Sequence, residues 1–402
     1  MAGHSSSSEV TVVGGGIVGL SIARAFRLRH PSATVTVFEK ERTSSAHGSG
    51  RNSGVLHAGF YYSPDSLKAR LTVRGNGMLR EFISEHGLRI RECGKVVVTR
   101  SEAELPMLAE LARRSDVNGA GTELISEAEL ATIEPRARTV GQALWSPRTA
   151  VADPVEVTEG IRADAERIGV VVHTGHPVTG IAKGEVRLAD HIHTTGHVIN
   201  CAGLHADRLA HEMGFGSGYR ILPFTGLYTY APSLTGFLRT HVYPVPDPAN
   251  PFLGVHATLT VDGTVKIGPT AIPALSREAY RPIRDISGND LAEIARTLPL
   301  FALSRHHRTL KLLRSELPKY VRASLVRSAR DLVPDLPTKA FMKKGKPGIR
   351  AQLFDLRERR LEMDFVIEGD EFSTHVLNAV SPGWTTSLAF AEHVIDSHVV
   401  LR

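Results

Sequence analysis

"EVTVVGGGIVGLSIARAFRLRHPSATVTVFEK", residues 9–40, is the stretch that predicts the fold. Valines at positions 10, 12 and 13 predict a buried strand. Apolar residues recur at helical spacing from Ile17 to Leu28, and Pro31 ends that helix. The following "TVTVFE" is rich in β-branched residues and predicts a second strand. The stretch therefore predicts a strand–helix–strand unit at the start of the chain.

A glycine motif lies where the first strand meets the helix. Gly14, Gly16 and Gly19 fit GxGxxG, and Glu39 follows the last of them by twenty residues. In this context the first glycine makes the tight turn, the second lets a pyrophosphate approach the helix N-terminus, and the third lets helix and strand pack closely. Glu39 is expected to accept hydrogen bonds from the adenosine ribose. The unit predicts a dinucleotide site that contains Gly14, Gly16, Ile17, Val18, Gly19, Glu39 and Lys40.

The rest of the chain does not continue as regular strand–helix repeats. Helices are predicted over residues 65–90, 102–114, 126–133 and 289–333, the third with a capping box of Ser126 and Glu129. Residues 153–175 and 196–207 look like the nucleotide domain resuming, and residues 222–300 alternate strands with Pro/Gly turns. Two strands within 361–380 precede a closing helix. This order indicates two interleaved domains rather than two consecutive ones.

Composition and charge limit the class of protein. The 402 residues are 42% hydrophobic and 22% charged, as in an ordinary globular protein. Of the net charge of +6, residues 305–350 contribute 13 Lys/Arg against 3 acids. A solvated basic face is the simplest interpretation, and attraction to an anionic membrane surface or an acidic substrate are the alternatives. No stacking aromatics interleave with these charges, which argues against nucleic acid binding.

Targeting and cysteine signals are both weak. No run of eighteen apolar residues occurs, and "MAGHSSSSEV" lacks the basic and apolar regions of a signal peptide. Cys93 and Cys201 lie far apart and form no metal-ligand spacing. We therefore expect a cytoplasmic protein without a bound metal.

A resemblance covers nearly the whole chain. The strings "VVGGGIVGLSIAR", "NSGVLHAGFYYSPDSLKARL", "INCAGLHADRLA", "PFLGVHATLTVDGTVKIGPTA" and "NAVSPGWTTSLA" resemble the FAD-dependent D-amino-acid-oxidase-like oxidoreductases, and within them the L-2-hydroxyglutarate dehydrogenase/oxidase branch. The resemblance implies an α/β protein in which a Rossmann-like FAD-binding domain is interleaved with a mixed or antiparallel-sheet α+β substrate domain. It also implies oxidation of a 2-hydroxy acid to the 2-oxo acid by hydride transfer to flavin N5.

The domain bounds follow from the same comparison of strings. The FAD-binding domain is expected to comprise residues 8–90, 151–221 and 343–402. The substrate domain is expected to comprise residues 91–150 and 222–342.

Four positions depart from the pattern of this branch. Arg51 stands where a histidine is expected, Thr225 where an arginine is expected, and Thr270 where an asparagine is expected. Trp384 replaces a small residue in the segment before the last helix, where it either narrows access to the flavin or packs. The substrate is accordingly left open between L-2-hydroxyglutarate and a related hydroxy acid.

Two residues are expected to carry the chemistry. His57 is the candidate base for the hydroxyl proton, with a hydrogen bond to flavin or to a loop carbonyl as the alternative. Arg350 is the candidate for carboxylate binding, because a planar guanidinium can bind a carboxylate with two hydrogen bonds. The alternative is that Arg350 is one more surface cation of the basic segment. Further substrate-binding candidates are Arg51, Tyr62, Thr225, Tyr228, His256 and Thr270.

The remaining cofactor contacts are implied by the resemblance. Gly50, Gly54 and Gly59 are expected to give clearance to the flavin ring, and the start of the last helix is expected to face its pyrimidine edge. The candidates are Asn52, Ser53, Gly54, Val178, Ala202, Gly203, Pro382, Gly383, Trp384, Thr385 and Thr386. The other singled-out histidines, read as surface or turn residues, are His47, His205, His306 and His307.

Alternative functions remain at this stage. The same fold could oxidise an amino acid or secondary amine, although a base such as His57 favours an alcohol, since an amine can lose its proton before binding. A non-catalytic flavoprotein or a membrane-surface binding module that uses the basic segment is the second alternative. The electron acceptor is either oxygen or a quinone, and contact with the inner face of the membrane would accompany the quinone.

Overall fold

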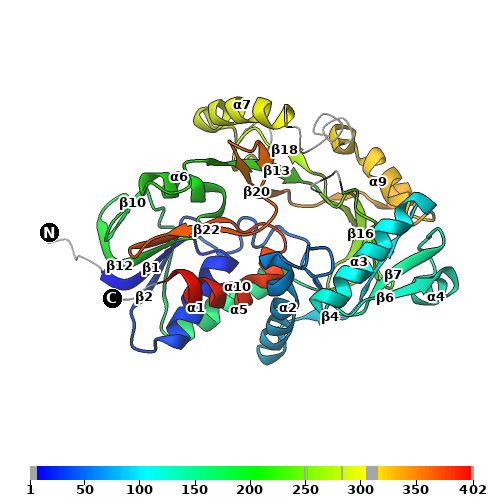
Figure 1. Ribbon diagram of the computed structural model, residues 1–402, viewed down its shortest axis with the longest axis horizontal. Helices are drawn as coiled ribbons and strands as arrows, with labels where there is room; N and C mark the ends of the chain where they lie inside the picture. Colours follow the sequence, from blue (N-terminus) through cyan, green and yellow to red (C-terminus); the bar gives the residue numbers. More distant parts are fainter. Residues whose placement is uncertain (1–6, 249, 251, 282–283, 305–315, 400–402) are drawn as a thin grey trace.

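The computed structural model describes residues 7–399, apart from 249, 251, 282–283 and 305–315. Figure 1 shows β1, β2 and β12 toward one end of the long axis and β6 and β7 toward the other, with α10 and α2 between them. None of the described helices is long and apolar enough to span a bilayer.

The first sheet has eight strands and contains the predicted strand–helix–strand unit. Its central strand β1 (Ser7–Val13) pairs in parallel with β2 (Val35–Glu39) on one side and β12 (Ile192–Asn200) on the other. The other strands are β9 (Val171–Thr174), β10 (Gly180–Ala182), β11 (Glu185–Arg187), β22 (Val366–Gly369) and β23 (Ser373–Asn378). These strands come from three separate parts of the chain, which confirms that the nucleotide-binding fold is interrupted.

Four helices pack around this sheet. They are α1 (Ile17–Arg29), α2 (Leu67–Glu85), α5 (Pro154–Arg167) and α10 (Gly383–His398). Helix α1 contacts both α5 and α10, and α10 contacts α2. Their buried apolar side chains form one core with those of β1 and β2. The first and last parts of the chain therefore share a core.

The second sheet also has eight strands. In spatial order they are β19 (Lys343–Lys344), β14 (Thr229–Ala231), β17 (Val265–Gly268), β16 (His256–Leu259), β15 (His241–Pro244), β5 (Lys95–Val98), β7 (Gln142–Ser146) and β6 (Glu123–Ser126). Only the β15–β5 pair is parallel, so the sheet is mixed as expected. The helices that belong to this part are α3 (Leu105–Asn118), α4 (Glu127–Ile133) and α9 (Arg322–Arg330).

Two small sheets join the large ones. One contains β18 (Ile272–Pro273), β13 (Tyr219–Gly226), β20 (Gly348–Asp355) and β21 (Arg360–Leu361), and the other contains β3 (Val55–Leu56), β8 (Ala150–Ala152) and β4 (Ile90–Arg91). The remaining α-helices are α6 (Ala206–Glu212) and α7 (Gly288–Ala302). The 3₁₀ turns are Glu102–Glu104, Gly203–His205, Pro232–Leu234, Leu317–Tyr320 and Thr338–Ala340.

Local capping sets several helix ends. The predicted capping box is confirmed, because Ser126 accepts from Glu129 N and the Glu129 side chain accepts from Ser126 N. The helix predicted over 65–90 is shorter, since it ends at Glu85 and Gly87 adopts a φ of +61°. The helical stretch predicted over 289–333 consists, in its described part, of α7, a 3₁₀ turn and α9.

Candidate active site

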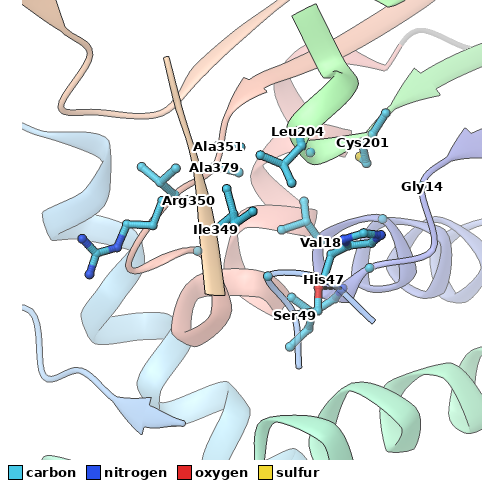
Figure 2. A pocket seen from close by; sticks show the side chains of 18 of the residues that line it. Gly14, Val18, His47, Ser49, Cys201, Leu204, Ile349, Arg350, Ala351 and Ala379 are labelled. Atoms are coloured by element: carbon cyan, nitrogen blue, oxygen red, sulfur yellow. Dashed lines mark hydrogen bonds between the residues drawn. The ribbon is translucent and has the colours of Figure 1, made fainter. Parts of the chain in front are cut away.

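A cavity of about 610 Å³ lies beside the ends of β1 and β2 in the first sheet and strand β20 of a small sheet. The glycine motif, the loop 43–57, β20 and the start of α10 all contribute to its lining. Figure 2 shows Gly14, Val18 and His47 on one side of it and Arg350 on the other. Of the predicted cofactor-binding residues, only Gly54 and Thr386 do not line this cavity.

The glycine motif has the geometry that a dinucleotide needs. Gly14 has a φ of +107°, and a Cβ there would come within 2.4 Å of the Cys201 carbonyl oxygen. A Cβ on Gly19 would lie 2.0 Å from the Gly14 carbonyl oxygen, so only glycine allows the helix to pack on the turn. Gly16 begins α1 and has no side chain to cap it, while Ser49 Oγ accepts from Ile17 N at 2.9 Å; all three residues line the cavity, so the positive end of the helix faces it.

Glu39 lies beside this turn at the end of β2. One carboxylate oxygen accepts from Gly15 N at 2.8 Å and the other accepts from Glu41 N at 2.9 Å. Burial raises the pKa of Glu39, while the two backbone N–H groups oppose that rise. The carboxylate is thus held in a fixed place on the cavity wall, and its contact with a ribose stays a prediction.

His47 and His205 both line the cavity, which the interpretation of them as surface or turn residues did not include, although His205 does belong to the 3₁₀ turn Gly203–His205. His47 Nδ1 is 2.6 Å from the Tyr280 hydroxyl, and its Nε2 is 3.0 Å from a Glu41 oxygen. His205 Nε2 is 2.8 Å from Glu278. Their partners at 278–280 are remote in sequence, so no local pattern pointed to this cluster. His306 and His307 lie outside the described residues.

The same cluster superficially resembles a cation site. Ligand atoms of Glu41, His47 and Glu278 all lie within 4.8 Å of one another. However, the Lys40 ammonium forms ion pairs with both carboxylates. A lysine in contact with both acids supplies the positive charge that a metal ion would bring, so the cluster joins two loops instead of predicting a metal centre.

His57 lies just beyond β3 with its ring on the cavity wall. Its backbone N–H donates to Thr385 Oγ1 at 3.2 Å, and its carbonyl accepts from Asn76 at 3.0 Å. The buried Nδ1 has no hydrogen-bond partner in the described part of the chain. Burial, with a smaller contribution from the charge of Lys95, lowers the pKa of His57 to about 3. The imidazole is therefore neutral near pH 7 and can accept a proton.

Arg350 projects from β20 into the same cavity. Its guanidinium carbon lies 5.4 Å from the centre of the Phe252 ring. No hydrogen bond or ion pair connects that guanidinium to another described residue. Burial lowers the pKa of Arg350, yet a guanidinium keeps its charge at any ordinary pH. The side chain is thus a buried cation that remains free to bind an anion.

Arg51 also lines the cavity but is already bound to the protein. Its Nε donates to the Ala46 carbonyl at 2.5 Å and its Nη1 to the Pro347 carbonyl at 3.2 Å. The guanidinium lies 4.1 Å from the centre of the Tyr280 ring. This arginine braces its loop, which makes Arg350 the better candidate for a substrate carboxylate.

The other substrate-binding candidates fall into two groups. Tyr228 lines the cavity, with its hydroxyl hydrogen-bonded to Ser53. The Thr270 hydroxyl accepts from Leu227 N at 3.0 Å and donates to the Thr225 carbonyl at 3.1 Å, so it braces backbone. The candidates that do not line the cavity are Tyr62, Thr225, His256 and Thr270. For these four, a contact with substrate stays a prediction.

Backbone atoms of the protein lie close to Gly50 and Gly54 and leave no room for a side chain at either position. A Cβ on Gly54, whose φ is +71°, would lie 2.2 Å from the Ala152 carbonyl oxygen. A Cβ on Gly50 would lie 2.1 Å from the Ser45 carbonyl oxygen. Neither of them, nor Gly59, lines the cavity, and clearance for a flavin ring by these three glycines stays a prediction.

The start of α10 meets the cavity as expected. Pro382, Gly383, Trp384 and Thr385 all line it. Thr385 Oγ1 donates to the Val55 carbonyl at 3.2 Å, which anchors the helix to β3 beside His57. The Trp384 side chain is only 8% exposed and belongs to the core of the first sheet, so it packs at the same time as it lines the wall.

The family follows from a match over almost the whole chain. Residues 9–397 match the model of a family described as FAD dependent oxidoreductase. The chain therefore belongs to this family. The resemblance inferred from the sequence strings is confirmed, and FAD is the cofactor. The glycine turn, which has no room for a Cβ and meets the positive end of α1, fits the pyrophosphate of such a dinucleotide.

Two relatives of this flavoprotein, one human and one bacterial, are both named L-2-hydroxyglutarate dehydrogenase. It is 35% identical over 414 residues to the human mitochondrial L-2-hydroxyglutarate dehydrogenase, covering 97% of this chain and 88% of the human one. It is 34% identical over 406 residues to the L-2-hydroxyglutarate dehydrogenase of Salmonella houtenae, covering 98% and 94%.

Among solved structures, the flavoprotein is similar to L-α-glycerophosphate oxidase from Mycoplasma pneumoniae with FAD bound. The TM-score is 0.77 at 22% identity, over 97% of this chain and 94% of that one. At this identity the likeness establishes the fold, and the fold class predicted from the sequence is confirmed.

Lys95, which was not among the predicted site residues, lies on the second sheet close enough to His57 to affect its pKa. The segment "CGKVVV" predicted only a strand. A lysine within a run of valines on a predicted buried strand was an available signal, because lysine is almost never fully buried without a partner.

Proposed function

We propose that this flavoprotein oxidises an L-2-hydroxy acid, with L-2-hydroxyglutarate as the first candidate, to the corresponding 2-oxo acid. The observation that carries the proposal is a pair of side chains that line one cavity: a neutral buried imidazole, His57, and a buried guanidinium, Arg350, that forms no hydrogen bond or ion pair with another described residue. The names of the relatives at 34–36% identity support the same substrate class.

The two side chains have complementary tasks in this reaction. Arg350 binds the carboxylate next to the reacting carbon with charge-assisted hydrogen bonds and so fixes the orientation of the acid. His57 then accepts the proton of the 2-hydroxyl group as the alcohol becomes a ketone. The bound FAD supplies the two-electron oxidant for this conversion. A base beside the hydroxyl group favours an alcohol over an amine as the substrate.

The cofactor contacts are proposed for the residues that line the nucleotide side of the cavity. The positive end of α1 would hold the pyrophosphate, with Glu39 on the ribose. The start of α10, anchored by Thr385, would face the flavin. The proposed set comprises Gly14, Gly16, Val18, Glu39, Asn52, Ser53, Ala202, Gly203, Gly383 and Thr385.

For the electron acceptor we propose a quinone, reached at the surface of an anionic membrane on its cytoplasmic face. The support is an exposed apolar patch of Tyr320, Val321 and Met342, which are 46%, 63% and 65% exposed. Arg322 Nη1 donates to Met342 Sδ at 3.2 Å, which brings the two segments together. Exposed Lys343 adds positive charge beside Met342. Apolar side chains ringed by cations are typical of peripheral membrane contact.

The main test is anaerobic bleaching of the flavin by a panel of L- and D-2-hydroxy acids, amino acids and secondary amines. The proposal expects bleaching by an L-2-hydroxy acid. Bleaching by amino acids alone would replace it with the amine alternative, and a flavin that no compound reduces would leave a non-catalytic flavoprotein. Sedimentation with phosphatidylglycerol vesicles tests the membrane contact, with loss of binding expected for Met342→Glu and unchanged binding for Val117→Glu, an exposed apolar residue of α3.

A further inference from the structure

Lys95 is a buried cation without a counter-ion. Its side chain is 0% exposed in the middle of the second sheet, and its Nζ has no hydrogen-bond partner in the described structure. The Nζ atom faces three aromatic rings instead, with centres at 5.0 Å for Phe60, 4.8 Å for Tyr61 and 4.6 Å for Tyr243. Aromatic faces attract an ammonium group but do not replace its lost hydration.

The other two fully buried lysines of the described chain are arranged differently. Lys68 lies near the Asp364 carboxylate, whose charge favours the ammonium form. Lys266 donates to the Ser53 carbonyl at 2.7 Å and lies near Asp153. For Lys95, the only such neighbour is the Cys93 thiol, and burial raises the pKa of that thiol to about 12. Lys95 alone among the three lacks a carboxylate.

The position of Lys95 relates it to the proposed reaction. His57 and His256 both have their pKa lowered by the charge of Lys95, and His256 is lowered by Arg350 as well. The His256 ring stacks on Tyr243, with centroids 3.8 Å apart. Lys95, which does not itself line the cavity, and Arg350, which does, therefore both lie near one stacked pair of rings that also adjoins His57.

Further polar atoms at this place lack partners. The Tyr61 hydroxyl and Nδ1 of His57 are both buried without a hydrogen bond to any described residue. The Lys95 ammonium lies 4.8 Å from the ring of the same Tyr61. Buried polar groups in folded proteins are nearly always hydrogen-bonded, so three such atoms in one neighbourhood point to a ligand that supplies acceptors.

We propose that Lys95 binds the second carboxylate of a dicarboxylic 2-hydroxy acid, whose first carboxylate is bound by Arg350, and that the Tyr61 hydroxyl donates to the same carboxylate. The inference rests on the proposed function and narrows its substrate class to diacids. A monoacid of equal length would place a methyl group against the ammonium and leave that charge without a partner, which is a strong basis for rejection.

The test compares L-2-hydroxyglutarate with L-2-hydroxyvalerate, which has the same carbon chain but a terminal methyl group. In the unaltered holoenzyme, kcat/KM for the diacid is expected to exceed that for the monoacid by about 100-fold or more. Lys95→Met should lower kcat/KM for the diacid by about 100-fold and leave the value for the monoacid unchanged or raised. Lys95→Arg, which keeps the charge, should retain part of the preference.

A binding measurement separates this inference from the proposed function. The products 2-oxoglutarate and 2-oxovalerate are titrated against the flavin spectrum of each holoenzyme, without turnover. Only the affinity for 2-oxoglutarate should fall in Lys95→Met. The matched control is Lys68→Met, another buried lysine, which should leave the ratio of the two affinities unchanged.

Three outcomes are decisive. Equal losses for both acids in Lys95→Met, or no preference in the unaltered protein, would overturn the diacid inference while the oxidation of 2-hydroxy acids stands. A Lys95-dependent preference for 2-oxoglutarate in a protein whose flavin no hydroxy acid reduces would overturn the proposed function instead. If Lys95→Met lacks FAD, Lys95→Gln and Lys95→Arg decide the matter by the same titration.

Discussion

The two sides of the cavity recognise their ligands by different means. At the nucleotide side, the turn after β1 is backbone and glycine, Glu39 is tied to two N–H groups, and the charged side chains Lys40, His47 and Glu278 are paired with one another. At the substrate side, His57 and Arg350 line the cavity, and Lys95, His57 and Tyr61 each have a buried polar atom without a hydrogen-bond partner among the described residues. The nucleotide side depends on the absence of side chains at its glycines, whereas the substrate side depends on buried polar side chains that have no hydrogen-bond partner in the described structure.

The largest effect is expected at the nucleotide side. Gly14→Ala adds a Cβ that would lie 2.4 Å from the Cys201 carbonyl oxygen, at a φ of +107°. The turn must move, so the purified protein should carry no FAD, as measured by absorbance and by the flavin released on denaturation. Gly77→Ala is the matched control, because no atom lies within 4 Å of its added Cβ. Normal FAD content in Gly14→Ala would contradict the backbone account of this side.

The next effect separates chemistry from cofactor binding. His57→Ala removes the proposed base and should slow flavin reduction by about 10²–10⁴-fold, with FAD still bound. Stopped-flow reduction under anaerobic conditions measures the rate, and the flavin content measures binding. A normal rate in this variant would assign the proton to another group and make His57 a structural residue.

A smaller effect is expected for the first carboxylate. Arg350→Met leaves the cavity shape nearly intact but removes the cation, so the affinity for 2-oxo acids should fall by about 100-fold. The loss should be similar for diacids and monoacids, since both carry the carboxylate next to the reacting carbon. Titration of the flavin spectrum checks this result. If only the affinity for diacids falls, Arg350 binds the second carboxylate and Lys95 binds the first.

The smallest effect is a pH dependence that only diacids show. Burial lowers the pKa of Lys95 to about 7, and a carboxylate binds the protonated form. The affinity for 2-oxoglutarate should therefore be constant below about pH 7 and fall by up to about tenfold per unit above it. The affinity for 2-oxovalerate should stay flat over the same range.

The groups that face Lys95 do not titrate in this window. Burial lowers the pKa of His57 to about 3 and holds those of His241 and His256 well below the usual value. It raises the pKa of Cys93 to about 12 and those of Tyr61 and Tyr243 well above the usual value. If the fall persists in Lys95→Met, another group causes it.

The features that were predicted correctly from the sequence involve residues close together in the chain, and those that were not predicted involve residues far apart in it. The capping box at Ser126 and the close packing of Gly19 on the Gly14 carbonyl involve residues a few positions apart, and both were predicted correctly. The contacts of His47 were not predicted because its partners Glu278 and Tyr280 lie more than two hundred residues away. The close contact at Gly54 was not predicted for a similar reason, because the Ala152 carbonyl that excludes its Cβ comes from another strand.

The sequence by itself determined the strand–helix–strand unit, its dinucleotide motif and the family, since these depend on local spacing and on strings of residues along the chain. Only the tertiary structure decided which cations have partners. Arg51 is bound by backbone carbonyls, whereas Arg350 and Lys95 form no ion pair with a carboxylate in the described part of the chain. A side chain's counter-ion is set by which strands pack together, because electrostatic interactions act through space and not along the sequence.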